Sequence, residues 1–242
     1  MSHAIFRPAP SGAVSAVWTR LRAGVREADL LFGVLVLGAG LRFTGLGQES
    51  YWIDEITMLS VSGRSLGDAA AEVMTGRPPA FVLLLHWWIG LVGTSEVAAR
   101  ALTAILGVAS LALLYLVGRR LVGGTAALAA TAVMALAPIQ LYQSQNLRYY
   151  GLVVLLAIAA AGAMVRLLER GRLPQVAAYV AAAVLLVLAH TYGVFVIAAH
   201  NLYMLLCIRR HRARLGAWVV AQVATVALVA PFLWVSATYV DA

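Results

Sequence analysis

The chain has 242 residues, of which 62% are hydrophobic and only 12% are charged, and its formal net charge is +8. Because a soluble globular domain usually has about a quarter of its residues charged, this composition excludes an ordinary soluble protein and predicts an all-helical, polytopic membrane protein. The basic residues are all arginines, and they cluster between apolar blocks, which favours a role in membrane topology over nucleic-acid binding.

The first 27 residues carry four arginines before any apolar block begins. A secretory signal has a short basic region followed by an apolar core of about 7–15 residues, and this leader is too long to fit that pattern. We therefore expect residues 1–27 to be a cytoplasmic N-terminal tail and residues 28–242 to form a single transmembrane domain.

Eight apolar blocks follow in chain order, at about 28–46, 79–93, 98–118, 124–142, 149–168, 174–190, 192–208 and 215–235. A helix needs about 20 residues to cross a hydrocarbon core of about 30 Å. The block 79–93 is only about 22 Å long at 1.5 Å per residue, and it begins at two prolines. We predict that this block is a surface helix and that the other seven are transmembrane helices.

Seven spans place the arginine-rich loops consistently. With the N-terminus in the cytoplasm, the nine arginines of 119–120, 166–172 and 209–214 all face the cytoplasm, as the positive-inside preference requires. The C-terminus then lies outside, and a large outer loop runs from about 47 to 97. The polar residues that remain gather at the outer face, where ionisable groups at membrane depth suggest a functional site.

Five segments of the chain carry a family resemblance. In order they read LRFTGLGQESYWIDE, RPPAF, GTSEVAARALTAILG, LYLVGRR and APIQLYQSQNLRYYGL. Over about residues 35–208 this series resembles the pattern of GT-C-fold glycosyltransferases, nearest to the bacterial relatives of protein O-mannosyltransferases and aminoarabinose transferases. The resemblance implies a conserved seven-helix module whose site lies in the first extracytoplasmic loop. It also implies a polyprenyl-phosphate-linked sugar donor, an acidic residue that acts on the acceptor, and basic residues that hold the donor phosphate.

Two adjacent carboxylates, Asp54 and Glu55, lie in that outer loop. Asp54 matches the catalytic acidic position of the family, and a carboxylate with an ordinary pKa of about 3.9 can accept a proton from an acceptor hydroxyl. The alternative is that Asp54 is the N-cap of a helix over 55–62. Glu55 is either a second acidic partner or a first-turn charge stabilised by the helix dipole.

Arginines at the outer ends of spans are candidates for binding the donor. Arg148, in the segment SQNLRYY, matches the family motif and can grip a phosphate through forked hydrogen bonds. The alternative is that it anchors the chain at the interface beside Tyr149 and Tyr150. Arg100 is a second candidate for the phosphate, and Tyr149 belongs to the same substrate-binding set.

Three further residues complete the substrate-binding set. Arg42 lies near the outer end of the first span, where it either pairs with Asp54 or snorkels to the lipid headgroups. Arg77 precedes Pro78-Pro79, at a position where the family commonly has His. The change to Arg puts a role inherited from that His in doubt, but the guanidinium could still contact a phosphate. His190 either contacts donor or acceptor at the outer rim or serves as a hydrogen-bonded residue at a helix end.

The candidate site residues do not indicate a cofactor. An acidic pair can bind a divalent cation through oxygen ligands, but no further carboxylate clearly joins Asp54 and Glu55, so we assign no metal ligands and leave a divalent cation as an open option.

These observations favour one function and leave three alternatives open. We expect an inverting glycosyltransferase of the bacterial cytoplasmic (inner) membrane that moves a sugar from a polyprenyl-phosphate donor to a glycan, lipid or protein acceptor on the extracytoplasmic face, with no nucleic acid involved. The alternatives are a non-catalytic fragment, a module that depends on a partner chain for a missing C-terminal part, and a carrier or flippase for lipid-linked intermediates.

Overall fold

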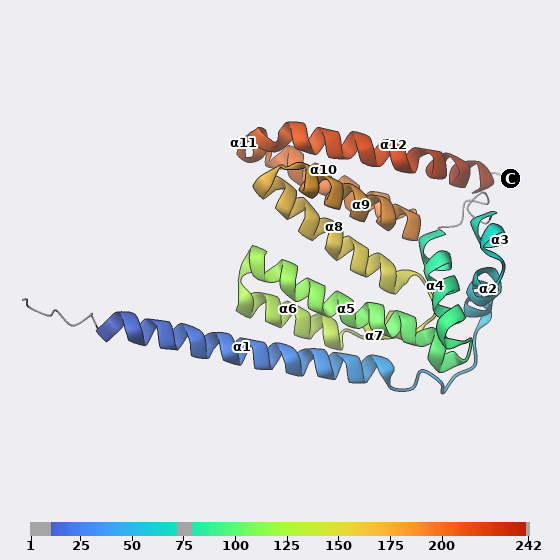
Figure 1. Cartoon of the computed structure of the whole chain (residues 1–242), viewed down its shortest axis with the longest axis horizontal. Coiled ribbons are helices and arrows are strands. Elements are labelled where there is room, and N and C mark those ends of the chain that lie inside the picture. Colours follow the sequence, from blue (N-terminus) through green and yellow to red (C-terminus); the bar gives the residue numbers. More distant parts are fainter. Residues whose placement is uncertain (1–10, 72–78, 241–242) are drawn as a thin grey trace, which may run out of the picture.

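The computed structural model describes residues 11–71 and 79–240, and the side chains of residues 26–68 and 79–238. Within these ranges every regular element is a helix (Figure 1), which confirms the all-helical prediction. The elements are α1 (Ser11–Phe43), α2 (Ile53–Ser62), α3 (Leu66–Ala71), α4 (Pro79–Val92), α5 (Glu96–Val122), α6 (Gly124–Leu136), α7 (Pro138–Gln145), α8 (Tyr150–Arg170), α9 (Leu173–Ala189), α10 (Gly193–Leu206), α11 (Ile208–His211), a 3-10 turn (Arg212–Arg214) and α12 (Leu215–Val240).

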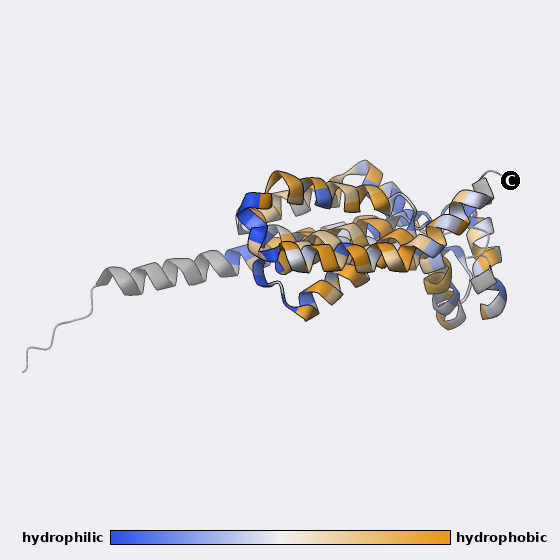
Figure 2. Cartoon of the chain, turned by 90° about the horizontal axis from the view of Figure 1, so that it is seen from above, coloured by the Kyte–Doolittle hydropathy of each residue, from blue (hydrophilic) through white to orange (hydrophobic). Residues whose placement is uncertain are grey.

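The long helices lie side by side along one axis, and the short helices α2, α3 and α4 lie across one end of the bundle (Figure 1). Apolar residues run along the helices, whereas hydrophilic residues gather at the two ends of the bundle (Figure 2). This arrangement is the one expected of helices that pack in lipid. Apolar side chains lie in the hydrocarbon core, and each helix satisfies its own backbone polar groups there.

Among the described residues, three helical stretches are long and apolar enough to cross a membrane, namely Glu96–Val122, Tyr150–Arg170 and Ile208–Thr238, and the pair α6 and α7 makes four if it counts as one span. The predicted spans at 174–190 and 192–208 are helices too, but α9 has 17 residues and α10 has 14. The break predicted at His190 is confirmed, since α9 ends at Ala189 and α10 begins at Gly193. The number of seven spans stays a prediction.

Two helices differ in form or extent from the apolar blocks predicted for them. The block 124–142 is not one straight helix, because α6 and α7 are bent by 59°. Pro138 is the first residue of α7, and a proline has no N–H for the helical hydrogen bond and clashes with the preceding turn. Helix α1 begins at Ser11, so it is longer than the apolar block at 28–46, and the cytoplasmic tail 1–27 and the transmembrane domain 28–242 stay predictions.

Helix α4 confirms that residues 79–93 are helical, and it packs across the bundle end, beside the start of α5. The indole N–H of Trp88 donates to the Ala98 carbonyl at 2.8 Å, and the Tyr51 hydroxyl donates to the Thr94 carbonyl at 2.9 Å. Burial and the nearby Glu96 carboxylate raise the pKa of Tyr51 to about 12, so this hydroxyl stays protonated. The described part of the predicted outer loop is thus a folded cap fixed to the helices below it.

Candidate active site

Asp54 lies in the first turn of α2, at the end of the bundle where α4 crosses. The helix begins at Ile53 with Trp52 as its N-cap, so the expectation that Asp54 caps a helix over 55–62 was wrong. The Asp54 side chain is 42% exposed, and the helix dipole stabilises a negative charge in this first turn. The carboxylate is therefore reachable from outside the bundle.

Arg148 forms an ion pair with Asp54 across 94 positions of the sequence. Its guanidinium carbon lies over three aromatic rings, at 5.7 Å from the centroid of Trp52, 5.1 Å from Tyr149 and 5.8 Å from Tyr150. One of its terminal nitrogens donates to the Tyr149 hydroxyl at 3.2 Å. Because the rings hold the guanidinium plane, its position is fixed although only one carboxylate binds it.

A cavity of about 270 Å³ lies beside this ion pair. Its walls come from α2, from the start of α4 and from the segment between α7 and α8, and they combine the ion pair with apolar side chains: Asp54, Thr57, Met58, Phe81, Val82, Arg148 and Tyr149. A cavity with apolar walls and a few convergent polar groups is the usual form of a small-molecule site.

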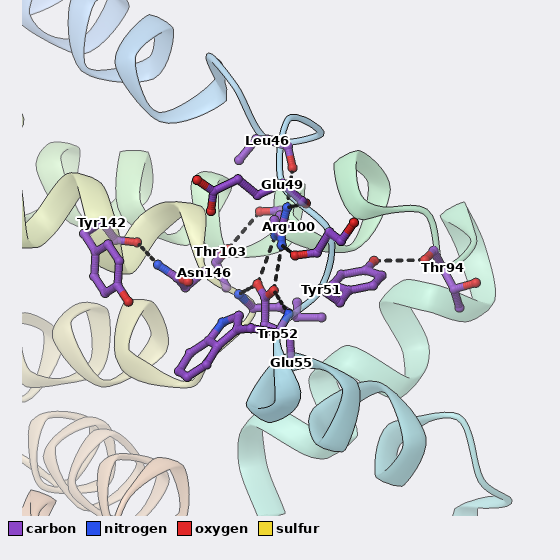
Figure 3. Close-up of polar contacts among 12 residues, drawn as sticks. Leu46, Glu49, Tyr51, Trp52, Glu55, Thr94, Arg100, Thr103, Tyr142 and Asn146 are labelled. Carbon is purple, nitrogen blue, oxygen red and sulfur yellow. Dashed lines mark hydrogen bonds and ion pairs between the residues drawn. The ribbon is translucent and has the colours of Figure 1, made fainter.

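The neighbouring carboxylate, Glu55, has a different environment (Figure 3). Its side chain is fully buried and binds the guanidinium of Arg100 through both oxygens, at 2.9 and 2.6 Å. The same carboxylate accepts the backbone N–H of Leu147 at 2.7 Å. Burial alone would raise the pKa of Glu55, but the hydrogen bonds from Arg100 and Leu147 outweigh it and lower the pKa below its ordinary value.

The remaining N–H groups of Arg100 bind backbone carbonyls of the segment that leads into α2. They donate to Leu46 and Glu49, each at 2.7 Å, and to Ser50 at 3.3 Å. Together with the two bonds to Glu55, these contacts use all five N–H donors of the guanidinium, and Arg100 is only 5% exposed. The structure thus places Arg100 where it ties this segment to α5 and has no free donor for a phosphate.

Tyr149 and His190 lie together at the edge of the same site. Their ring centroids are 4.7 Å apart, and Tyr150 stacks on His190 at 6.4 Å. Burial, and then the charge of Arg148, lower the pKa of His190. The imidazole is therefore neutral at pH 7, and its Nδ1 accepts the backbone N–H of Tyr192 at 3.1 Å.

Arg42 does not pair with Asp54. It is fully buried, and it donates to the carbonyls of Gly38 at 3.0 Å, Ala135 at 3.1 Å and Met134 at 3.3 Å. The last two carbonyls belong to the end of α6, where the bend before Pro138 removes their helical donors. Arg42 therefore supports the bend between α6 and α7, and neither of the two roles considered for it, pairing with Asp54 or snorkelling, describes these contacts.

Arg77 lies outside the described residues, so its predicted contact with phosphate stays a prediction. Among the described residues, no group of three or more His, Cys, Asp or Glu side chains is placed to hold a metal ion.

Sequence reasoning missed a buried polar network between α9, α10 and α12. The Gln222 amide donates to the Tyr179 hydroxyl at 3.2 Å, and Asn201 donates to the Gln222 carbonyl oxygen at 3.0 Å while accepting the Trp218 indole N–H at 3.1 Å. His200 lies 3.3 Å from the Tyr179 hydroxyl. The available signal was the presence of His, Asn and Gln inside apolar blocks, where polar side chains bind neighbouring helices.

Comparison with known protein families gives a match. Residues 76–235, more than half of the chain, match the family model described as dolichyl-phosphate-mannose-protein mannosyltransferase. The matched range includes Arg148, Tyr149 and His190, and it begins after Asp54 and Glu55. No curated protein and no solved structure matches the chain.

Proposed function

The chain belongs to the dolichyl-phosphate-mannose-protein mannosyltransferase family and is a membrane glycosyltransferase of the GT-C type, and from this premise we propose that it transfers a sugar from a polyprenyl-phosphate-linked donor to an acceptor hydroxyl on the extracytoplasmic face. The anomeric configuration is inverted. The acceptor is a glycan, a lipid or a protein. The seven predicted spans place α2, α3 and α4 on that outer face.

The observation that carries this proposal is the ion pair of Asp54 and Arg148 beside the cavity. Asp54 is a partly exposed carboxylate, and Arg148 is a cation held between aromatic rings. The reaction needs these two kinds of group, because a proton must leave the acceptor and a negative phosphate must leave the sugar. Glu55, which is next to Asp54 in the sequence, is instead buried against Arg100 of α5.

In the proposed reaction the acceptor oxygen attacks the anomeric carbon and forms a new C–O bond. The bond from that carbon to the phosphate oxygen breaks, and the lipid phosphate leaves with the electron pair. Asp54 takes the proton of the acceptor hydroxyl, a form of help that contributes about 10²–10⁴ in rate. Arg148 stabilises the charge that develops on the leaving phosphate.

The resting ion pair gives Arg148 a second role. While the donor is absent, Arg148 neutralises Asp54; when the donor phosphate binds the guanidinium, the phosphate competes with the carboxylate for its N–H donors. Asp54 is then released toward the acceptor. A single carboxylate base and a direct displacement give inversion, because no covalent sugar intermediate is formed on the protein.

The test is transfer of labelled sugar from polyprenyl-phosphate donors by membranes that contain the parent chain, Asp54→Asn or Asp68→Asn. Asp68 is the matched control, since it is an exposed carboxylate of the same cap whose partner is Ser65. We expect Asp54→Asn to lose about 10²–10⁴ of the activity and Asp68→Asn to keep it. Equal activity in both variants would remove Asp54 from the mechanism. Donor binding without transfer by the parent would instead support a carrier.

A further inference from the structure

A groove of about 410 Å³ lies between α5, α8 and α9, toward the end of the bundle opposite to Asp54. Its walls are mostly apolar and include Leu116, Val117 and Ala159. Gly162 brings the helices close together here, because a Cβ at this position would come within 2.7 Å of Val117. The groove therefore offers an apolar wall along α5 and α8, against which an acyl chain can lie.

Two exposed arginines, Arg120 on α5 and Arg166 on α8, line the groove. Neither forms an ion pair with a carboxylate among the described side chains, where the ion pairs join Glu55 to Arg100 and Asp54 to Arg148. Two guanidinium groups from different helices at one groove can bind one phosphate through several charge-assisted hydrogen bonds.

The groove also holds a polar group that lacks a partner. The Gln175 side chain, in the first turn of α9, lines the groove, and its Oε1 atom is buried without a hydrogen-bond donor among the described residues. A buried acceptor without a donor is costly. If the Gln175 side chain turns its amide into the groove, an occupant that carries a hydroxyl group supplies the missing donor.

The surroundings favour an anionic occupant. The same end of the bundle carries Arg170 and Arg172 in the α8–α9 connection. Basic pockets between transmembrane helices bind the headgroups of anionic lipids, and basic residues near the surface attract them.

We propose that this groove is a binding site for an anionic phospholipid with a glycerol headgroup, phosphatidylglycerol in type. Arg120 and Arg166 hold the phosphate, a headgroup hydroxyl donates to Gln175 Oε1, and one acyl chain lies along the apolar wall of α5 and α8. This site is separate from the proposed sugar transfer, so either assignment can fail without the other.

The first experiment measures the binding of fluorescent phosphatidylglycerol and phosphatidylcholine to the purified full chain in detergent. The double variant Arg120→Gln/Arg166→Gln is compared with Arg209→Gln/Arg210→Gln, which removes the same charge from α11 at the same end. We expect the groove variant to lose about thirtyfold in affinity for phosphatidylglycerol, from about fivefold per arginine, and the α11 variant to change less than about twofold. Equal losses in both variants, or equal affinity for the two lipids, would overturn the proposal.

Two further variants test the parts of the site that carry no charge. Ala178 lines the groove and Ala177 does not, while both are exposed residues of α9. Ala178→Phe should displace the lipid and Ala177→Phe should not. Gln175→Leu should remove the preference for phosphatidylglycerol over phosphatidic acid, which lacks the headgroup hydroxyls. If free glycerol phosphate displaces the lipid as well as the lipid displaces itself, the groove binds a soluble phosphate and the assignment to a membrane lipid is wrong.

Discussion

The Arg100 guanidinium grips both carboxylate oxygens of Glu55 inside the protein, at 2.9 and 2.6 Å, and joins α5 to α2. The carboxylate next to it in sequence, Asp54, is 42% exposed. Adjacent residues of one helix turn point in different directions, so one carboxylate enters the core and the other reaches the cavity. Glu55 thus stabilises the cap, whereas Asp54, as we propose, takes part in the reaction.

The first prediction follows from this division. Glu55→Gln should destabilise the protein by about 3–5 kcal/mol, because it leaves the Arg100 charge buried without its partner. Asp54→Asn removes the same charge one residue away and should cost about 0–1 kcal/mol, since its ion pair is partly exposed. The measurement is thermal unfolding of the two variants in detergent. Similar losses of stability would show that the two carboxylates are not divided in this way.

The second prediction concerns pH. The pKa of Glu55 in the folded protein lies below its ordinary value of 4.5, because the hydrogen bonds from Arg100 and Leu147 outweigh the effect of burial. A lowered pKa means that its contribution to stability is complete above the unfolded value and is lost as the pH falls through the folded value. The parent should therefore lose more stability than Glu55→Gln between about pH 5 and the acid limit of the native state. Parallel pH profiles of unfolding would contradict this.

Much of the fold could be predicted from sequence, because apolar block lengths and proline positions act locally. The helix at 79–93 and the break at His190 both follow from such signals, and the structure has them. The bend between α6 and α7 was missed although Pro138 marks it, since block length alone cannot separate one span from two bent halves. What holds the bend is Arg42 from α1, a contact over 93 positions that no local pattern contains.

The candidate site was predictable in some of its members, such as Asp54, Arg148 and Tyr149, but not in its pairings. The sequence indicates Asp54 and Arg148 as a carboxylate and a cation of the outer face, and the structure joins them in one ion pair. The sequence does not indicate that all N–H donors of Arg100 bind Glu55 and backbone carbonyls. These contacts depend on how residues 46–50 fold over α5. Pairing is a property of tertiary packing, and local motifs leave it open.

The third prediction tests how Arg148 acts. Arg148→Lys keeps the charge but loses the planar guanidinium that lies over Trp52, Tyr149 and Tyr150 and the forked donors that fit a phosphate. We expect kcat/KM for the donor to fall by about tenfold in Arg148→Lys and by about a hundredfold in Arg148→Gln, which loses one charged hydrogen bond to phosphate. Arg210→Lys is the control at the far end of the bundle. Full activity in Arg148→Gln would show that the donor phosphate is bound elsewhere.

The fourth prediction concerns the close approach of α5 to the bend between α6 and α7. A Cβ at Gly107 would lie 2.3 Å from Ser144 Oγ and 2.9 Å from Arg42 Nε, whereas a Cβ at Gly40 would meet nothing within 4 Å. Gly107→Ala should therefore cost about 1–3 kcal/mol through overpacking, and Gly40→Ala should be neutral or stabilise α1 by up to about 1 kcal/mol.

The double variant Gly107→Ala/Ser144→Ala then tests the cause. Removal of the Ser144 hydroxyl makes room for the new methyl group, so the two changes should be less costly together than the sum of their separate effects. The measurement is thermal unfolding of the parent, of Gly107→Ala, of Ser144→Ala and of the double variant. Additive losses would mean that Gly107→Ala acts through the backbone or through Arg42. In that case the bend depends on the position of the Arg42 guanidinium more than on the packing of Ser144 against α5.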